Sequence, residues 1–167
     1  MSAVLALVAA TAMAVPAPSG LDAYKPLLGE WVGTSNGQFG RATVSRKYEK
    51  VAAGTAIRYE TVARFVDAAG KATNTHRDFG YITFDRSSKK SLIREFIEEG
   101  AVLTYVQESD SPFQFKSKEI ENNPVPHSVA RTAWRLDGKD SFVEVFEIAM
   151  PGKPFGEMQR IAFRKKR

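Results

Sequence analysis

Residues 27–37 read LLGEWVGTSNG, a stretch in which a short turn leads directly into the first predicted strand. Gly29 permits a tight backbone turn at the start of this strand. Trp31 supplies a side chain large enough to close one end of a β-barrel. Gly33 allows strong strand coiling or a close approach of the neighbouring backbone. We therefore expect Gly29, Trp31 and Gly33 to shape one end of a barrel.

From Gly29 onward, β-branched and aromatic runs alternate with turn residues, and no stretch has sustained helical periodicity. The predicted strands span residues 30–35, 41–51, 55–66, 73–85, 91–98, 102–108, 113–121, 129–136, 142–150 and 158–164. About ten short strands joined by hairpin-length links predict an all-β, up-and-down antiparallel barrel, because closure removes the sheet edges. A short helical turn is expected over residues 21–28, and a β-sandwich is the alternative architecture.

The last predicted strand would lie beside the first in such a barrel. An arginine of this strand, Arg160 or Arg164, is then expected to stack over the indole of Trp31. We include Arg164 among the barrel-closing residues for this reason.

The N-terminal segment predicts the compartment. Residues 2–15 read SAVLALVAATAMAV, which is apolar, uncharged and too short to span a bilayer. Ala12-Met13-Ala14 matches the small-x-small pattern of a signal-peptidase site, although no basic n-region precedes the apolar run. We expect a signal peptide at 1–14, a Pro-rich linker at 15–20 and one barrel domain at 21–167, exported to the periplasm or secreted. A buried N-terminal helix is the alternative.

Charge and composition exclude several classes of function. Lys and Arg outnumber Asp and Glu by 24 to 19, but they are spread along the chain and form a dense cluster only at residues 164–167. No zinc-finger, basic-heptad or aromatic RNA-binding pattern accompanies this short tail, so we expect no nucleic-acid partner. The chain contains no cysteine, which removes disulfides and thiolate metal sites. The oligomeric state is left open.

Motifs for catalysis and metal binding are absent from the sequence. There is no Gly-x-Ser-x-Gly elbow, phosphate-binding loop or dinucleotide fingerprint. Glu98 and Glu99 fall at a turn and alternate faces, so they do not form an acid/base pair. His76 and His127 are isolated from each other and from any acidic cluster, which predicts no zinc site. No catalytic residue is assigned, and enzymatic activity is left open.

Several predicted strands carry charge on both faces. Arg94 shares a face with Leu92, for example, while Glu95 lies on the opposite face. Inward charges would have to be paired or meet a ligand. We therefore expect an interior site for a small apolar or amphipathic molecule, with Arg94 or Arg131 holding a carboxylate or other anionic head group; the alternative is that the charges form ion pairs on the outer wall. The candidate ligand-binding residues are Tyr59, Tyr81, Arg94, Phe96, Tyr105, Arg131, Trp134 and Phe146.

The sequence 27–33 resembles the opening of the nitrobindin-like haem-binding β-barrels, a branch of the calycin group, and secreted relatives of unknown function share its Gly-x-Trp. His76 to Tyr81 resembles the family's His-x-x-x-Gly-aromatic strand. Glu98-Glu99-Gly100 resembles its central hairpin, and 146–163 its last hairpin. The resemblance runs from about Tyr24 to Arg164 and implies a calycin-like, lipocalin-related barrel.

The same resemblance implies a ferric haem protein that binds nitric oxide and isomerises peroxynitrite. The family's proximal haem ligand is a His a few residues after a Pro-apolar pair. Aligning Pro154-Phe155 with that pair places Met158 where this His belongs, and no His follows His127. A haem held by Met158 and His76 is the alternative to an apolar or amphipathic ligand, and Met158 as ordinary packing is the simpler interpretation. No cofactor is therefore assigned, and haem remains an alternative.

Overall fold

The computed structural model describes residues 19–109 and 111–167, which form one closed antiparallel barrel. A 3-10 helix, η1 (Ser19–Leu27), precedes the barrel, and a short second one, η2 (Ala52–Gly54), joins two strands. The strands are β1 (Gly29–Gly37), β2 (Arg41–Val51), β3 (Ala56–Val66), β4 (Ala72–Asp85), β5 (Lys90–Ile97), β6 (Val102–Gln107), β7 (Gln114–Glu121), β8 (Val129–Leu136), β9 (Ser141–Ala149) and β10 (Phe155–Lys165). Each strand pairs with the next along the chain, and β1 pairs with β10 to close the sheet.

The predicted fold class is confirmed, including the N-terminal helical turn. The strand boundaries agree closely because Gly, Pro and polar turn residues act locally. The largest difference is in β10, which begins at Phe155 directly after Pro154 and contains a β-bulge between Glu157 and Gln159. The extra residue at this bulge is Met158.

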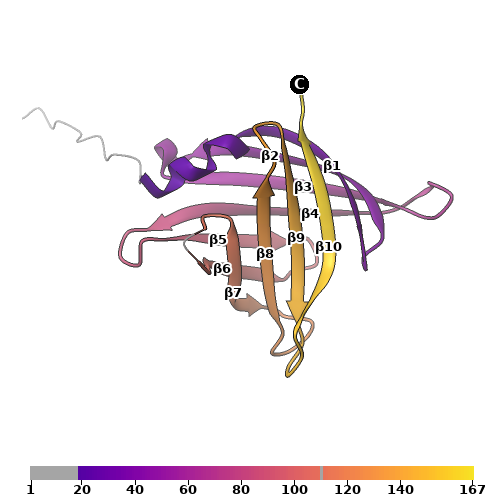
Figure 1. The fold of residues 1–167 in the computed structure, drawn as a ribbon. Helices are drawn as coiled ribbons and strands as arrows, with labels where there is room; N and C mark the ends of the chain where they lie inside the picture. The colour runs from indigo at the N-terminus through magenta and orange to yellow at the C-terminus, as the bar shows by residue number, and fades with distance from the viewer. Residues whose placement is uncertain (1–18, 110) are drawn as a thin grey trace, which may run out of the picture.

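The helix η1 covers one end of the barrel, the end at which the chain also terminates (Figure 1). Its side chains Leu21, Tyr24 and Leu27 are buried. The Tyr24 hydroxyl donates to the carbonyl of Pro112 at 2.6 Å, and Trp31 Nε1 donates to the carbonyl of Leu27 at 2.6 Å. These bonds satisfy polar atoms that would otherwise be buried without partners.

The cation over the indole of Trp31 is Lys165 rather than an arginine. Lys165 Nζ lies 5.3 Å from the Trp31 ring centroid. Arg164 is exposed on the outer face, because the neighbouring Phe163 occupies the inward position, and Arg160 pairs with Glu157 outside the barrel. The prediction that Arg164 stacks on Trp31 is therefore wrong. The residue that does so is the next one in the chain, and adjacent residues of a strand point to opposite faces of the sheet.

The predicted signal peptide at 1–14, and the predicted linker up to residue 18, lie outside the described residues. Within residues 19–109 and 111–167, no helix is long and apolar enough to cross a membrane.

A substitution at Gly33 tests how closely β1 and β10 pack. A Cβ atom at Gly33 would lie 2.8 Å from the carbonyl oxygen of Ala162 and 2.9 Å from the Phe163 ring. Because a backbone oxygen cannot easily move, we expect Gly33→Ala to lower the free energy of unfolding by about 1–3 kcal/mol in urea titrations. Gly156→Ala is the control, since its nearest neighbour would be 3.9 Å away. Equal effects of the two substitutions would contradict this packing.

Candidate functional site

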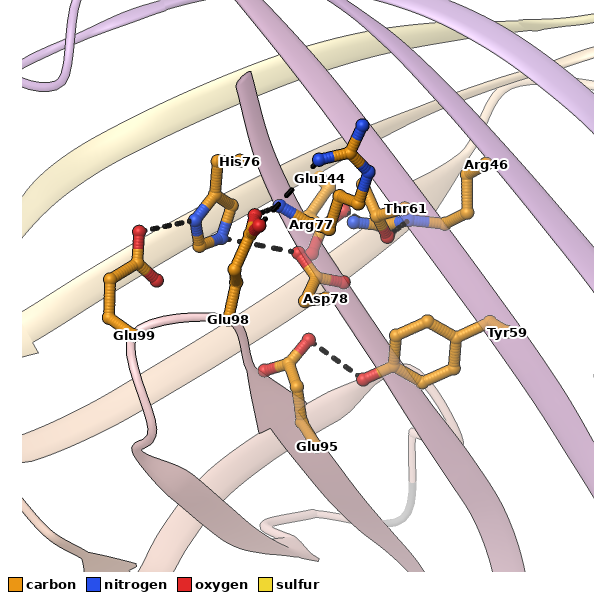
Figure 2. A network of polar contacts seen from close by, with 10 residues as sticks. All are labelled: Arg46, Tyr59, Thr61, His76, Arg77, Asp78, Glu95, Glu98, Glu99 and Glu144. Carbon is orange, nitrogen blue, oxygen red and sulfur yellow. Dashed lines mark hydrogen bonds and ion pairs between the residues drawn. The ribbon is translucent and has the colours of Figure 1, made fainter. Parts of the chain in front are cut away.

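A polar network lies in the barrel interior, and it includes the buried Arg46 of β2 (Figure 2). The guanidinium forms an ion pair with Glu144 of β9, and its Nε donates to the Thr61 hydroxyl at 2.8 Å. Its Nη1 also donates to the Tyr48 hydroxyl at 3.2 Å. Only 4% of the Arg46 side chain is exposed. This burial is tolerated because the charge is paired and hydrogen-bonded.

Aromatic rings surround the same guanidinium. Its central carbon lies 4.9 Å from the Phe163 ring centroid and 5.6 Å from that of Tyr59. Glu144 completes the pair from the other side, since its second oxygen accepts a hydrogen bond from the Thr132 hydroxyl at 3.2 Å. Both members of the ion pair are thus held by neutral groups as well as by each other.

Glu95 of β5 is a second inward carboxyl, and it lies away from the ion pair. Its Oε1 accepts a hydrogen bond from the Tyr59 hydroxyl at 2.8 Å, and the buried Tyr105 side chain lies close to it. Burial raises the pKa of Glu95 to about 8, and the nearby Asp78 carboxylate adds to this rise. Glu95 is therefore largely protonated at neutral pH.

Asp78 of β4 faces the same region, as Figure 2 shows. Its Oδ2 lies 3.6 Å from His76 Nε2, while His76 Nδ1 lies 2.9 Å from Glu99 Oε1. The contact with Asp78, together with the bond to Glu99, raises the pKa of His76 to about 9 despite partial burial. The imidazole is therefore a cation at neutral pH, with a carboxylate at each nitrogen.

Four of the residues predicted to bind ligand face the interior. Tyr59 and Tyr105 contact Glu95, and Phe146 is half-buried on the inward face of β9. Trp134 is buried, and its ring lies 5.5 Å from Phe115 in the half of the barrel beside η1. The first three residues thus border the polar network, whereas Trp134 packs in the aromatic core.

The other four predicted residues lie on the outer face. Phe96 stacks on Phe79 at 4.9 Å, and Tyr81 meets the edge of Phe79 at 6.4 Å. Arg94 forms an exposed ion pair with Glu121 at 2.8 Å. Because Glu95 points inward, its neighbours Arg94 and Phe96 must point outward, and Tyr81 lies opposite Arg94 in the sheet register. Their placement as interior wall residues is wrong.

Arg131 is likewise outside the barrel. Its Nε donates to Glu147 at 2.8 Å, and its guanidinium lies 4.3 Å from the Phe155 ring centroid. The neighbouring Ala130 and Thr132 are the inward residues of β8. The inward arginine is Arg46, so neither arginine expected to hold a head group is in a position to do so.

The sequence contained a signal for Arg46 that the prediction missed. In β2 the positions 42, 44 and 48 are Ala, Val and Tyr, while 41, 43, 45, 47 and 49 are all polar. Strict alternation therefore places Arg46 on the apolar, inward face. Glu95 and Glu144 also stand between apolar residues, but the opposite faces of β5 and β9 are apolar as well, so alternation gives no such signal for these two residues.

The residues expected at a haem iron do not fit that group. Both ring nitrogens of His76 are engaged by carboxylates. Met158 occupies the bulge of β10, and the buried inward residue beside it is Gln159. Neither side chain is presented as a free axial ligand. Within the described parts of the chain, no group of three or more His, Asp or Glu side chains could hold a metal ion.

A surface groove of about 400 Å³ lies on the outer wall rather than in the interior. Its lining includes the outward residues Ala133, Val143, Val145 and Arg160. It does not contain the buried polar network, so the network and not this groove is the candidate site.

No family model and no curated protein matches the chain. Among solved structures, it is similar to that of Rv2717c from M. tuberculosis, with a TM-score of 0.69 and 19% identity over 90% of this chain and 99% of the other. At this identity the similarity shows a shared fold, which in this chain is a closed antiparallel barrel of strands β1 to β10. A de novo designed fluorescence-activating barrel is more distant, with a TM-score of 0.46 and 14% identity over 87% of this chain and 98% of the other.

The Arg46–Glu144 pair gives a test of the network. Arg46→Met leaves the Glu144 carboxylate in the interior without its cation, and we expect a loss of about 3–5 kcal/mol in the free energy of unfolding. Arg46→Met combined with Glu144→Gln is expected to recover much of this loss. The control Arg94→Met breaks an exposed pair and should cost less than about 1 kcal/mol. If Arg46→Met costs no more than this control in urea unfolding, the pair does not hold the interior together.

The pKa values of Glu95 and His76 predict a falling stability with rising pH. Folding raises the pKa of Glu95 from about 4.3 and that of His76 from about 6.5, to about 8 and about 9. Between the two values of each group the folded protein retains a proton that the unfolded chain releases, so the free energy of unfolding decreases as pH rises.

In urea unfolding measured from pH 5.5 to 8.5, we expect this decrease in the wild type. Glu95→Gln mimics the protonated carboxyl at every pH, so its curve should be flatter below pH 8. A wild-type stability that increases over this interval, or an unchanged slope in Glu95→Gln, would contradict the assignment.

Proposed function

We propose that this protein is an exported binding protein that holds a small apolar or amphipathic molecule in the half of its barrel opposite η1. The observation that carries the proposal is the difference in packing between the two halves of the interior. The expectation of export rests on the sequence of residues 2–20.

The half beside η1 is filled by large side chains. Those that are no more than 2% exposed include Tyr24, Trp31, Tyr48, Ile57, Ile82, Tyr105, Phe115, Phe142 and Phe163. Edge and stacked ring contacts, such as Phe142 with Phe163 at 4.6 Å, leave this half with the close packing of an ordinary core.

The opposite half has smaller or partly accessible inward side chains. Ala42, Ala63 and Ala130 supply short wall positions. The inward side chains of Ile97, Phe146, Ile148 and Ile161 keep part of their surface accessible. Inward side chains that keep contact with solvent show that water reaches this half of the interior, which is where a ligand of a small barrel would enter.

Buried polar atoms without partners support the same half as the binding region. Of the four such atoms among the described residues, Ser35 Oγ, Asp78 Oδ1 and Gln159 Oε1 lie in this half, and Trp134 Nε1 lies in the packed half. Leaving such atoms unsatisfied is costly, and a bound ligand or water molecules would supply the missing partners. An apolar body against the Ile and Phe side chains, with a polar end at these atoms, fits this arrangement.

We also propose a distant relationship to the nitrobindin-like barrels, supported by the 27–33 opening and by the barrel fold. The relationship carries no haem function here, since His76 and Met158 do not fit the group as described above.

A neutral apolar dye tests the proposal. N-phenyl-1-naphthylamine should gain fluorescence on binding to the purified protein, because the accessible half offers an apolar environment. Ile148→Trp places a bulky ring in that half, and we expect dye binding at least fivefold weaker in fluorescence titrations. Val145→Trp on the outward face of the same strand is the control and should bind like the wild type. Equal binding by the two variants would place the dye outside the barrel.

A further inference from the structure

The polar groups of the accessible half have a strong bias toward hydrogen-bond acceptors and acids. Three inward carboxyl groups, Asp78, Glu95 and Glu144, come from three different strands, while Arg46 is the inward arginine. Glu144 neutralises Arg46 and uses its second oxygen with Thr132. Asp78 contacts the His76 imidazole through Oδ2, and Glu95 accepts a hydrogen bond from Tyr59, but neither carboxyl group has an arginine or lysine partner in the interior of the described barrel.

The buried polar atoms of this half that have no hydrogen-bond partner show the same bias toward acceptors. Gln159 is 7% exposed, and its amide nitrogen is directed to the carbonyl of Gly40 at 3.4 Å, which leaves Oε1 as an acceptor without a donor. Asp78 Oδ1 is a second acceptor without a donor. Ser35 is 5% exposed, and its hydroxyl has no partner of either kind. A ligand that satisfies these atoms must bring N–H or O–H groups.

We infer that the interior site selects a ligand with a hydrogen-bond-donating, positively charged head group, a primary ammonium on an apolar body, over the corresponding carboxylate. The inference rests on the proposed function and specifies its ligand class. It also reverses the expectation of an anionic head group held by an inward arginine.

An ammonium has three donors and no acceptor, which suits acceptors without a donor such as Asp78 Oδ1 or Gln159 Oε1. Charge-assisted hydrogen bonds to the Asp78 carboxylate would strengthen this match. A carboxylate head group would instead be repelled by the Asp78 carboxylate, and neither Asp78 Oδ1 nor Gln159 Oε1 has a proton to donate to it. The apolar body would contact Phe146 and Ile148.

The protonated His76 does not change the preference for an ammonium head group. His76 lies at the open end with 27% of its side chain exposed, and Glu99 and Asp78 contact its two nitrogens. An anionic ligand would have to displace one of these carboxylates to reach the imidazole. Arg46 is similarly engaged through Nε and Nη1.

Three ligands with the same alkyl chain length distinguish the contribution of the head group to binding from that of the apolar body. We would titrate the full chain with octylamine, octan-1-ol and octanoate at pH 7 by isothermal titration calorimetry. We expect octylamine to bind at least tenfold more tightly than octanoate, with octan-1-ol between them. Equal or tighter binding of octanoate would overturn the inference while leaving the proposed function intact. If none of the three binds, the proposed function fails and the inference fails with it.

Two near-isosteric variants test whether the interior acidic side chains cause the preference for octylamine. Asp78→Asn should reduce the preference of octylamine over octanoate at least fivefold, since it removes an interior negative charge. Glu95→Gln should change the preference much less at pH 7, since Glu95 is largely protonated there. Octan-1-ol carries no charge, so its binding reports whether a variant still has a folded site. Glu121→Gln on the outer face is the control and should keep the wild-type preference. A preference unchanged in Asp78→Asn, in protein that binds octan-1-ol, would overturn the assignment.

Discussion

The ion pair between Arg46 and Glu144 is the interaction on which the interior of this barrel depends. It joins β2 to β9, which are separated by β1 and β10 in the sheet, so it connects two walls that share no backbone hydrogen bonds. An isolated charge at either position would cost several kcal/mol, and the pair is tolerated because Thr61, Tyr48 and Thr132 complete its hydrogen bonding. Neither residue can be exchanged alone without leaving the other charge unpaired.

This network separates two regions with different packing. Toward η1, aromatic and aliphatic side chains fill the barrel, and Trp31, Tyr24 and Lys165 close its end. Toward the other end, alanines and partly accessible Ile and Phe side chains border a polar floor that contains Asp78 and Glu95. The same closed sheet thus combines a closely packed base with a more accessible region, where we propose that a ligand binds.

The nearby acidic side chains also explain why the pKa values of Glu95 and His76 are both raised. Burial and the neighbouring Asp78 keep a proton on Glu95, and the same Asp78 helps to keep one on His76. Protonation relieves the repulsion that three inward carboxylates would otherwise exert. A bound cation would relieve it in another way, so that proton and ligand act on the same excess of acidic groups.

The sequence by itself determined the ten strands, their turns and the antiparallel order, because each depends on residues close together in the chain. It also contained the inward position of Arg46, in the clean alternation of β2, although the prediction overlooked it. It did not determine the inward faces of β5 and β8. In β5, Leu92, Arg94 and Phe96 on one side and Ile93, Glu95 and Ile97 on the other have the same mixture of apolar and charged character.

Only the tertiary structure decided between these faces, since the choice depends on the register with neighbouring strands. Gly80, for example, lies opposite both Tyr59 and Glu95. Because Gly80 has no side chain, the tyrosine ring has room to reach the carboxyl group. Pairing between residues distant in the chain also brought Arg46 to Glu144 and left Asp78, Ser35 and Gln159 with unpartnered atoms. Local patterns carry no information about such distances, and the candidate site is therefore a product of barrel closure.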